Sequence, residues 1–142
     1  MPELPEVEII SRSLDSLVSG RIIDSAKLLR ERLAPDTRPA AFAKKLKGSL
    51  INFVHRRGKH ILFDLDNGRT LITHLRMSGR FSLLTADLEN PKFAHAVFYF
   101  NDEARLAFDD QRHFGLMKIV DTKQLYDAKE LKKLAPEPFS EE

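Results

Sequence analysis

The sequence predicts an α+β, mostly β domain: an antiparallel β-sandwich flanked by two α-helices. The first reason is that the spacing of apolar residues changes along the chain: it is helical near the N-terminus, and from residue 49 onward apolar residues alternate with polar ones. The second is Asn67-Gly68, a strong hairpin signal between two alternating segments. The third is length, since 142 residues with 42% hydrophobic content can bury one core. We therefore expect a single domain over residues 1–142.

The helices are predicted at residues 5–19, 40–47 and 122–133. Pro5 suits a first helical turn, and Gly20 and Gly48 are plausible stops after the first two helices. Strands are expected over 21–30, 49–55, 61–65, 71–75, 80–84, 95–101, 104–109 and 115–120. Alternation places Ile51, Phe53 and His55 on one face of their strand. The Pro-rich segment 135–138 is expected to end the domain.

Composition excludes several classes of protein. The chain has no cysteine, so it forms no disulfide and no thiolate zinc site. Its five histidines have no ligand-like spacing, and we expect neither a metal nor a cofactor in this chain. No apolar run reaches membrane-spanning length, and the N-terminus is too acidic for a signal peptide. A soluble, cytoplasmic protein is the simple expectation.

Charge is unevenly distributed along the chain although the net charge is only +2. Residues 55–80 contain six lysines and arginines but only two aspartates. A basic segment in a nearly neutral chain is compatible with a phosphate-binding face, although charged strands usually just face solvent. The six basic residues are Arg56, Arg57, Lys59, Arg69, Arg76 and Arg80.

The N-terminal octet Met-Pro-Glu-Leu-Pro-Glu-Val-Glu holds the most unusual chemistry of the chain. Removal of Met1 would leave Pro2 with a free secondary amine beside the carboxylate of Glu3. An α-amino group has a pKa near 8, so roughly a tenth of it is neutral at pH 7 and can attack carbonyl-like carbon. A secondary amine yields a cationic iminium that withdraws electrons. Pro2 could also be merely a tolerated start residue.

Three further segments could take part in chemistry or binding. In Arg56-Arg57-Gly58-Lys59, the glycine allows a tight bend, and alternation would send Lys59 to the face opposite its neighbours. A basic surface turn is the ordinary alternative. The other two segments, 74–79 and 110–115, place apolar side chains on turns, where loose core packing is the usual explanation. Exposed apolar side chains can instead wedge between base steps and fill the space left by a flipped base.

These four segments together resemble the formamidopyrimidine-DNA glycosylase family, bifunctional repair enzymes that excise oxidised purines such as 8-oxoguanine and formamidopyrimidines. The resemblance rests on the octet, on Arg-Arg-Gly-Lys, on His-Leu-Arg-Met-Ser-Gly and on Arg-His-Phe-Gly, in that order. It implies that Pro2 attacks C1′ to form a Schiff base, that Glu3 acts as an acid and that Lys59 assists proton transfer. The same resemblance makes Met77, Arg112 and Phe114 the void-filling residues.

Two further residues, Arg57 and His95, are expected to contact DNA. Many relatives have histidine where this chain has Phe93, so a phosphate contact there is lost or shifted to His95. The turn Asp110-Gln111 replaces the family's Asp-Pro. Leu4 and the void-filling set favour the purine branch of the family over the oxidised-pyrimidine branch.

The resemblance covers about half of a full-length relative and leaves out the helical DNA-binding domain and the zinc finger. It implies a monomeric, nucleoid-associated bacterial DNA glycosylase with AP lyase activity. Its partner would be double-stranded DNA with an oxidised purine or abasic site, and its zinc would lie outside this chain. We expect the chain alone to be weak or inactive. Two alternatives stay open: a non-catalytic binder of damaged DNA, and a tautomerase that uses an N-terminal proline as a base.

Overall fold

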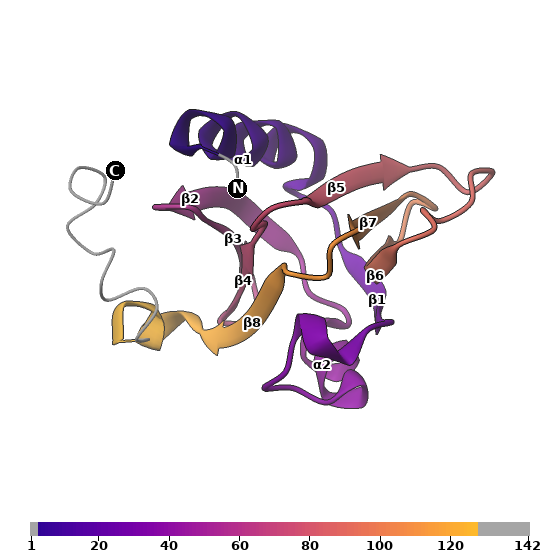
Figure 1. Ribbon diagram of the computed structural model, residues 1–142. Helices are drawn as coiled ribbons and strands as arrows, with labels where there is room; N and C mark the ends of the chain where they lie inside the picture. The colour runs from indigo at the N-terminus through magenta and orange to yellow at the C-terminus, as the bar shows by residue number, and fades with distance from the viewer. Residues whose placement is uncertain (1–2, 128–142) are drawn as a thin grey trace.

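Two four-stranded antiparallel sheets face each other in the computed structural model, which describes residues 3–127 (Figure 1). The first sheet has the order β1 (Ile23–Leu28), β6 (Ala94–Phe100), β7 (Arg105–Asp110), β5 (Gly79–Leu84). The second has the order β2 (Ile51–Arg57), β3 (His60–Leu65), β4 (Arg69–His74), β8 (Leu116–Asp121). The helices are α1 (Leu4–Val18), α2 (Pro39–Leu46) and the 3₁₀ helices η1 (Glu31–Leu33) and η2 (Thr122–Asp127). The predicted sandwich with two flanking α-helices is confirmed.

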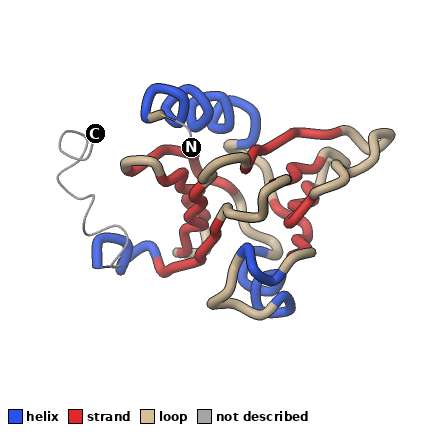
Figure 2. Tube along the Cα trace, in the orientation of Figure 1, coloured by secondary structure: helices blue, strands red, loops and turns tan. Residues whose placement is uncertain are grey.

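The core fills the space between the two sheets. Alternate residues of each sheet point inward, and aromatic rings connect the layers. The Phe63 ring of β3 lies 5.4 Å from Phe81 of β5, which lies 5.0 Å from Phe108 of β7. Figure 2 shows the two α-helices on opposite sides of the strands. Helix α2 packs beside β1, where its buried Phe42 lies 6.1 Å from Phe98.

Helix α1 covers the free edge of the second sheet. It buries Val7, Leu14 and Val18 against the core. Helix α1 also forms a hydrogen bond with the sheet, because Asp15 Oδ1 accepts the backbone N–H of Val54 in the edge strand β2 at 2.7 Å. An edge strand otherwise exposes unpaired backbone groups. The helix and the strand therefore form one unit, with the start of α1 beside the end of β2 (Figure 1).

The prediction that Ile51, Phe53 and His55 share a face is wrong. The pairing of β2 with β3 shifts register between Ile51 and Phe53, which inserts one extra residue into β2. Such a bulge reverses the facing of every later residue. Ile51 is buried, Phe53 is 45% exposed, and Val54 points into the core in its place.

The Asn67-Gly68 hairpin is confirmed, and it joins β3 to β4. The C-terminal helix differs from the prediction, because residues 122–127 form a 3₁₀ helix instead of the start of an α-helix. The remainder of that predicted helix and the Pro-rich segment 135–138 lie outside the described residues. Within residues 3–127, no helix is long and apolar enough to cross a membrane.

Candidate active site and nucleic-acid interface

Glu3, the residue after the predicted nucleophile Pro2, lies at the N-terminal end of α1. Pro2 lies outside the described residues, whereas Glu3 is exposed and directly precedes the helix. The backbone N–H of Glu3 donates to Glu6 Oε1 at 2.8 Å. This bond attaches the amide nitrogen that follows Pro2 to the first turn of α1. The roles predicted for Pro2 and Glu3 stay predictions.

The turn between β2 and β3 carries Lys59. Arg57 pairs with His60 across the hairpin, so Gly58 and Lys59 alone form the turn. Gly58 adopts a φ of +57°, in the left-handed region that glycine enters without strain. The tight bend at Gly58 is confirmed. Lys59 lies in the turn and outside both strands, so strand alternation does not determine its facing, which stays a prediction.

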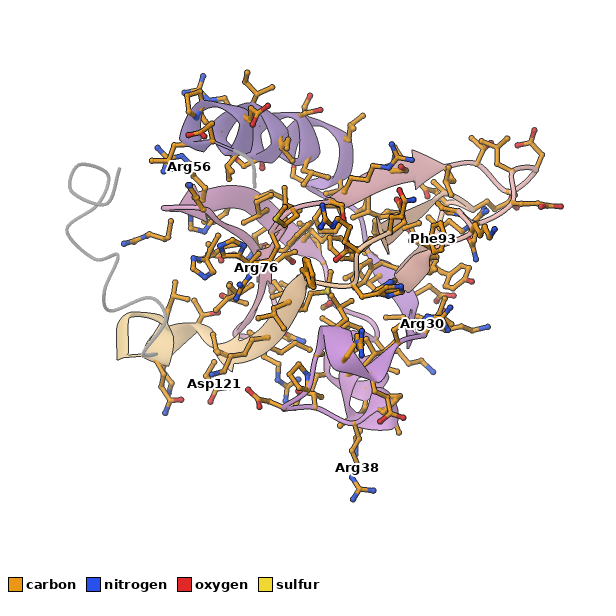
Figure 3. All side chains as sticks on the ribbon, viewed as in Figure 1. Arg30, Arg38, Arg56, Arg76, Phe93 and Asp121 are labelled. Carbon is orange, nitrogen blue, oxygen red and sulfur yellow. The ribbon has the colours of Figure 1, made fainter. Side chains whose placement is uncertain are left out.

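An ion pair connects α1 to this turn. Arg56 Nε lies 2.5 Å from Glu8 Oε1, and the same guanidinium donates through Nη1 to the carbonyl of Gly58 at 3.2 Å. The second carboxylate oxygen of Glu8 accepts from Arg12 Nε, also at 2.5 Å. Figure 3 shows Arg56 between the start of α1 and the end of β2. Hydrogen bonds from Arg56 and then Arg12 hold the pKa of Glu8 below its ordinary value.

Two histidines that sequence reasoning left without a role meet on the outer face of the second sheet. His60 and His74 are paired across β3 and β4, with ring centroids 4.9 Å apart and planes at 90°. The Nδ1 atom of His74 accepts the backbone N–H of Arg76 at 3.1 Å. The pKa of His74 is lowered to about 4, first by burial and then by the electrostatic influence of His60, Arg76 and Lys59. His74 is therefore a neutral acceptor at pH 7.

A cavity of about 180 Å³ opens beside these histidines. Figure 3 labels Arg76, which lines the cavity together with residues of β3, β4 and β8. Its wall combines charged side chains of both signs, imidazole rings and aliphatic groups. The lining residues are Pro35, Asp36, His60, Ile72, His74, Arg76, Leu116, Met117 and Lys118.

The predicted void-filling residues lie on two loops that the fold brings together. Met77 lies two residues before the start of β5 and Phe114 two residues before the start of β8, and each is 50% exposed. The guanidinium carbon of Arg112 lies 5.6 Å from the centroid of the Phe114 ring. The backbone N–H of Arg112 donates to Ser78 Oγ at 3.1 Å, so the residue after Met77 contacts Arg112 directly.

Asp110 is the centre of this contact between loops. It is fully buried, and its Oδ1 accepts from Ser78 Oγ at 2.5 Å and from Arg112 N at 3.2 Å. Its Oδ2 accepts from Gly115 N at 2.6 Å. Burial alone would raise the pKa of Asp110, but these hydrogen bonds outweigh it and the pKa lies below its ordinary value.

Two glycines let both loops approach the same aromatic ring. A Cβ at Gly79 would lie 2.6 Å from Phe108 Cζ and 2.7 Å from the Leu75 carbonyl oxygen. A Cβ at Gly115 would lie 2.9 Å from both Phe108 Cζ and Asp110 Oδ2. Neither position has room for a side chain, so the loops that carry Met77 and Phe114 are both anchored on Phe108.

His95 is placed less favourably for DNA than the sequence indicates. Its side chain is 1% exposed and stacks on His113 at 4.7 Å, with the planes 27° apart. Burial and then repulsion from His113 lower the pKa of His95. Phe93 contacts the same His113 ring edge-on, at 6.4 Å. The phosphate contact predicted for His95 stays a prediction.

Metal binding finds no support in the part of the chain that the structure describes. No group of three or more histidine, aspartate or glutamate side chains within residues 3–127 could hold an ion. The arrangement instead combines cationic and apolar groups suited to a phosphate backbone and to bases.

Comparison with known proteins identifies similar chains. Residues 1–117 match the sequence model of the family described as the formamidopyrimidine-DNA glycosylase N-terminal domain. A formamidopyrimidine-DNA glycosylase of Listeria innocua is 41% identical over 140 residues, which are 99% of this chain and 51% of that protein. One from Lactiplantibacillus plantarum is 35% identical over 142 residues, 100% of this chain and 52% of that protein.

Solved structures give the same result for the fold. The Lactococcus lactis Fpg in complex with DNA that contains an abasic site superposes with a TM-score of 0.83 and 33% identity, over 89% of this chain and 46% of that one. The same bacterium's T221P mutant Fpg, bound to DNA that contains Fapy-dG, gives a TM-score of 0.83 and 34% identity, over the same shares of the two chains. The chain thus spans about half the length of the relatives that it matches.

Proposed function

Because the chain belongs to the formamidopyrimidine-DNA glycosylase family, we propose that it supplies the N-terminal catalytic domain of a bifunctional DNA glycosylase and AP lyase. This glycosylase excises oxidised purines, among them 8-oxoguanine and formamidopyrimidines, from double-stranded DNA, and acts as a monomer. The family membership and the similarity to DNA-bound structures support the substrate class. The abasic-site and Fapy-dG DNA in those structures belongs to those proteins and motivates the assignment here.

The nucleophile is the amine of Pro2 once Met1 has been removed. Its nitrogen lone pair forms a bond to C1′ of the everted nucleotide as the glycosidic bond breaks. The base leaves with the electron pair of the glycosidic bond and takes up a proton, and the Pro2 nitrogen releases its own proton. Glu3 protonates O4′ as the sugar ring opens, which leaves a cationic iminium between Pro2 and C1′. The exposed position of Glu3 directly before α1 supports the role proposed for Glu3.

Strand cleavage follows from the same iminium. Its positive charge acidifies the proton on C2′, and loss of that proton expels the 3′ phosphate as the C3′–O bond breaks. Loss of the C4′ proton then drives a second elimination that breaks the C5′–O bond and expels the 5′ phosphate, and water hydrolyses the iminium to free Pro2. Lys59 assists by proton transfer and by contact with a phosphate, and the tight turn that carries it supports this role.

Met77, Arg112 and Phe114 occupy the space that the everted nucleotide leaves in the duplex. Flipping costs a few kcal/mol per unstacked step, and apolar wedges offset part of that cost. The observation that carries the proposal is the hydrogen-bonded link between Ser78 and Asp110, 32 residues apart, which joins the two loops that carry these side chains. Arg57 adds a contact with the DNA backbone.

Borohydride trapping tests the proposal. The chain without Met1 is incubated with an abasic-site duplex and reduced, and we expect a covalent protein–DNA adduct. The matched control carries an extra N-terminal residue, which converts the Pro2 nitrogen to an amide. An adduct that this control forms equally well contradicts the mechanism. Binding of the duplex without any adduct identifies a non-catalytic binder of damaged DNA instead.

A further inference from the structure

We propose that Glu8 and Arg56 are positioning residues, which hold the turn carrying Lys59 in place relative to the start of helix α1. The inference rests on the proposed function, because it concerns how the predicted nucleophile and the predicted proton-transfer residue are placed. It assigns Glu8 and Arg56 a role that acts through the placement of Lys59 and not through contact with the reacting atoms.

Arg56 bridges helix α1 and the turn between β2 and β3. The Arg56 guanidinium reaches two structures at once: Glu8 Oε1 on α1 at 2.5 Å, and the carbonyl of Gly58 in the turn at 3.2 Å. Gly58 immediately precedes Lys59 in the chain. Glu8 lies within the first half of α1, the helix whose N-terminal end follows Pro2 and Glu3. One side chain therefore connects the two predicted catalytic segments.

An arginine is well suited to this bridge. Its guanidinium is planar and its donors diverge in fixed directions, so contact with Glu8 sets the direction of the donor aimed at Gly58. A lysine has a single charged centre and cannot impose that relation. The Arg56 side chain is only 19% exposed and that of Glu8 35%, so water screens this pair less than a pair on the open surface.

The turn formed by Gly58 and Lys59 needs a contact from outside the hairpin to hold it in one conformation. Gly58 is in a left-handed conformation and the turn has only two residues. Glycine is also the residue with the widest choice of backbone conformations. A hydrogen bond from α1 through Arg56 to the Gly58 carbonyl restricts that choice in a way that the hairpin alone does not.

The experiment compares variants of the 142-residue chain without Met1 under single-turnover conditions on an abasic-site duplex. Adduct formation is followed by trapping and strand scission by gel, because scission depends on Lys59 while the adduct depends on Pro2. For Arg56→Ala and for Glu8→Gln we expect scission at least five-fold slower, with adduct formation changed less than two-fold. Arg56→Lys should fall between the parent and Arg56→Ala.

Arg12→Ala is the matched control. Arg12 contacts the same carboxylate through the other oxygen but reaches no part of the turn, and its side chain is 80% exposed. We expect its scission rate to equal that of the parent. If scission by Arg12→Ala is as slow as scission by Arg56→Ala, the positioning role is overturned, because both losses would then reflect a less stable helix α1. Slowing in Arg56→Ala but not in Glu8→Gln also overturns it, because that pattern indicates a lost DNA contact.

A measurement on the free protein separates this inference from the proposed function. Amide hydrogen exchange at Gly58 and Lys59 should be faster in Arg56→Ala and Glu8→Gln and unchanged in Arg12→Ala. Unchanged exchange in all three variants overturns the bridge, whatever the chemistry. If the parent chain forms no adduct, the proposed function is overturned, and so is the catalytic role of the bridge. Faster exchange in Arg56→Ala and Glu8→Gln would then show only that the bridge stabilises the turn. If Arg56→Ala fails to fold, Glu8→Gln and Arg56→Lys decide by the same two readouts.

Discussion

The hydroxyl of Ser78 donates a 2.5 Å hydrogen bond to the buried carboxylate of Asp110, and this bond joins the loop after Met77 to the loop that carries Arg112 and Phe114. The carboxylate accepts two backbone N–H groups of its own loop as well, from Arg112 and Gly115. A charged group with no exposure is stable only when such donors surround it. The Asp110 carboxylate thus organises the two predicted wedge segments as one unit.

Substitution of Ser78 by alanine should loosen that unit without unfolding the domain. Hydrogen bonds to charged groups contribute about 1.5–3 kcal/mol, and we expect a loss of that size in the free energy of unfolding, measured with urea. Affinity for an abasic-site duplex should fall as well, because Met77 and Phe114 no longer keep their relative placement. Thr85→Ala serves as a control, since the Thr85 hydroxyl donates to the exposed Asp87. Equal affinity of the parent and Ser78→Ala contradicts this view of the link.

The stability of the domain should fall steeply in acid, and Asp110 should be one cause. Its folded pKa lies below the ordinary value of 3.8, so the folded state binds its proton less readily than the unfolded state. The stabilisation is complete above pH 3.8 and is lost as the pH falls through the lower folded pKa. Asp110→Asn should reduce this acid dependence in urea titrations performed from pH 2 to pH 5. An unchanged slope in the variant contradicts the assignment.

His74 should make a separate contribution at higher pH. Its pKa is lowered from 6.5 to about 4, so between these values the unfolded state is protonated and the folded state is neutral. Stability should therefore decline as the pH falls from 6.5 to 4, a window above that of Asp110. An NMR titration of the imidazole resonances should show His74 neutral down to about pH 4. Titration of His74 near 6.5 would show that it is more hydrated than its position indicates.

Alanine at Gly79 should be strongly destabilising because of space. The new Cβ would meet both the Phe108 ring and a backbone carbonyl, and a carbonyl cannot move aside as a flexible side chain can. Overpacking of this kind costs about 1–3 kcal/mol or more. Gly48→Ala is the control, because nothing lies within 4 Å of its Cβ and only its φ of +80° is unfavourable. Equal losses in the two variants, measured by thermal unfolding, would show that backbone conformation dominates at both sites.

Excision of oxidised purine by the 142-residue chain should be weak. The chain spans about half the length of the relatives that it matches, and in a full-length relative the second half can add contacts with DNA. Fusion of this chain to the second half of the Listeria innocua protein should restore excision by at least ten-fold, measured as base release from a duplex. Turnover by the short chain equal to that of the full Listeria innocua protein contradicts this expectation.

Local sequence signals predicted the fold well. The helical spacing of Val7, Leu14 and Val18 reports a single buried stripe, and this is how α1 packs on the sheet. Asn67-Gly68 marks a turn whose conformation suits few other residue pairs. The loop between β3 and β4 has three residues, 66–68, one more than a two-residue Asn67-Gly68 turn would have, so the pairing of His60 with His74 could not be predicted from this signal alone.

Features that depend on distant contacts could not be predicted. The bulge in β2 accompanies hydrogen bonds between the strand and α1, including the one from Val54 to Asp15, 39 residues away. The burial of Asp110 likewise depends on Ser78 and on the ring of Phe108, and the sequence around it indicates only a polar turn. The Glu8–Arg56 ion pair spans 48 residues and leaves no local pattern.

Peptide mapping of the borohydride-reduced adduct tests the central claim most directly. Digestion and mass spectrometry identify the residue to which the sugar remnant is attached. The account predicts attachment at the nitrogen of Pro2, in an N-terminal peptide that has lost Met1. Attachment at Lys59, or at any other lysine, with an unmodified N-terminal peptide would contradict it.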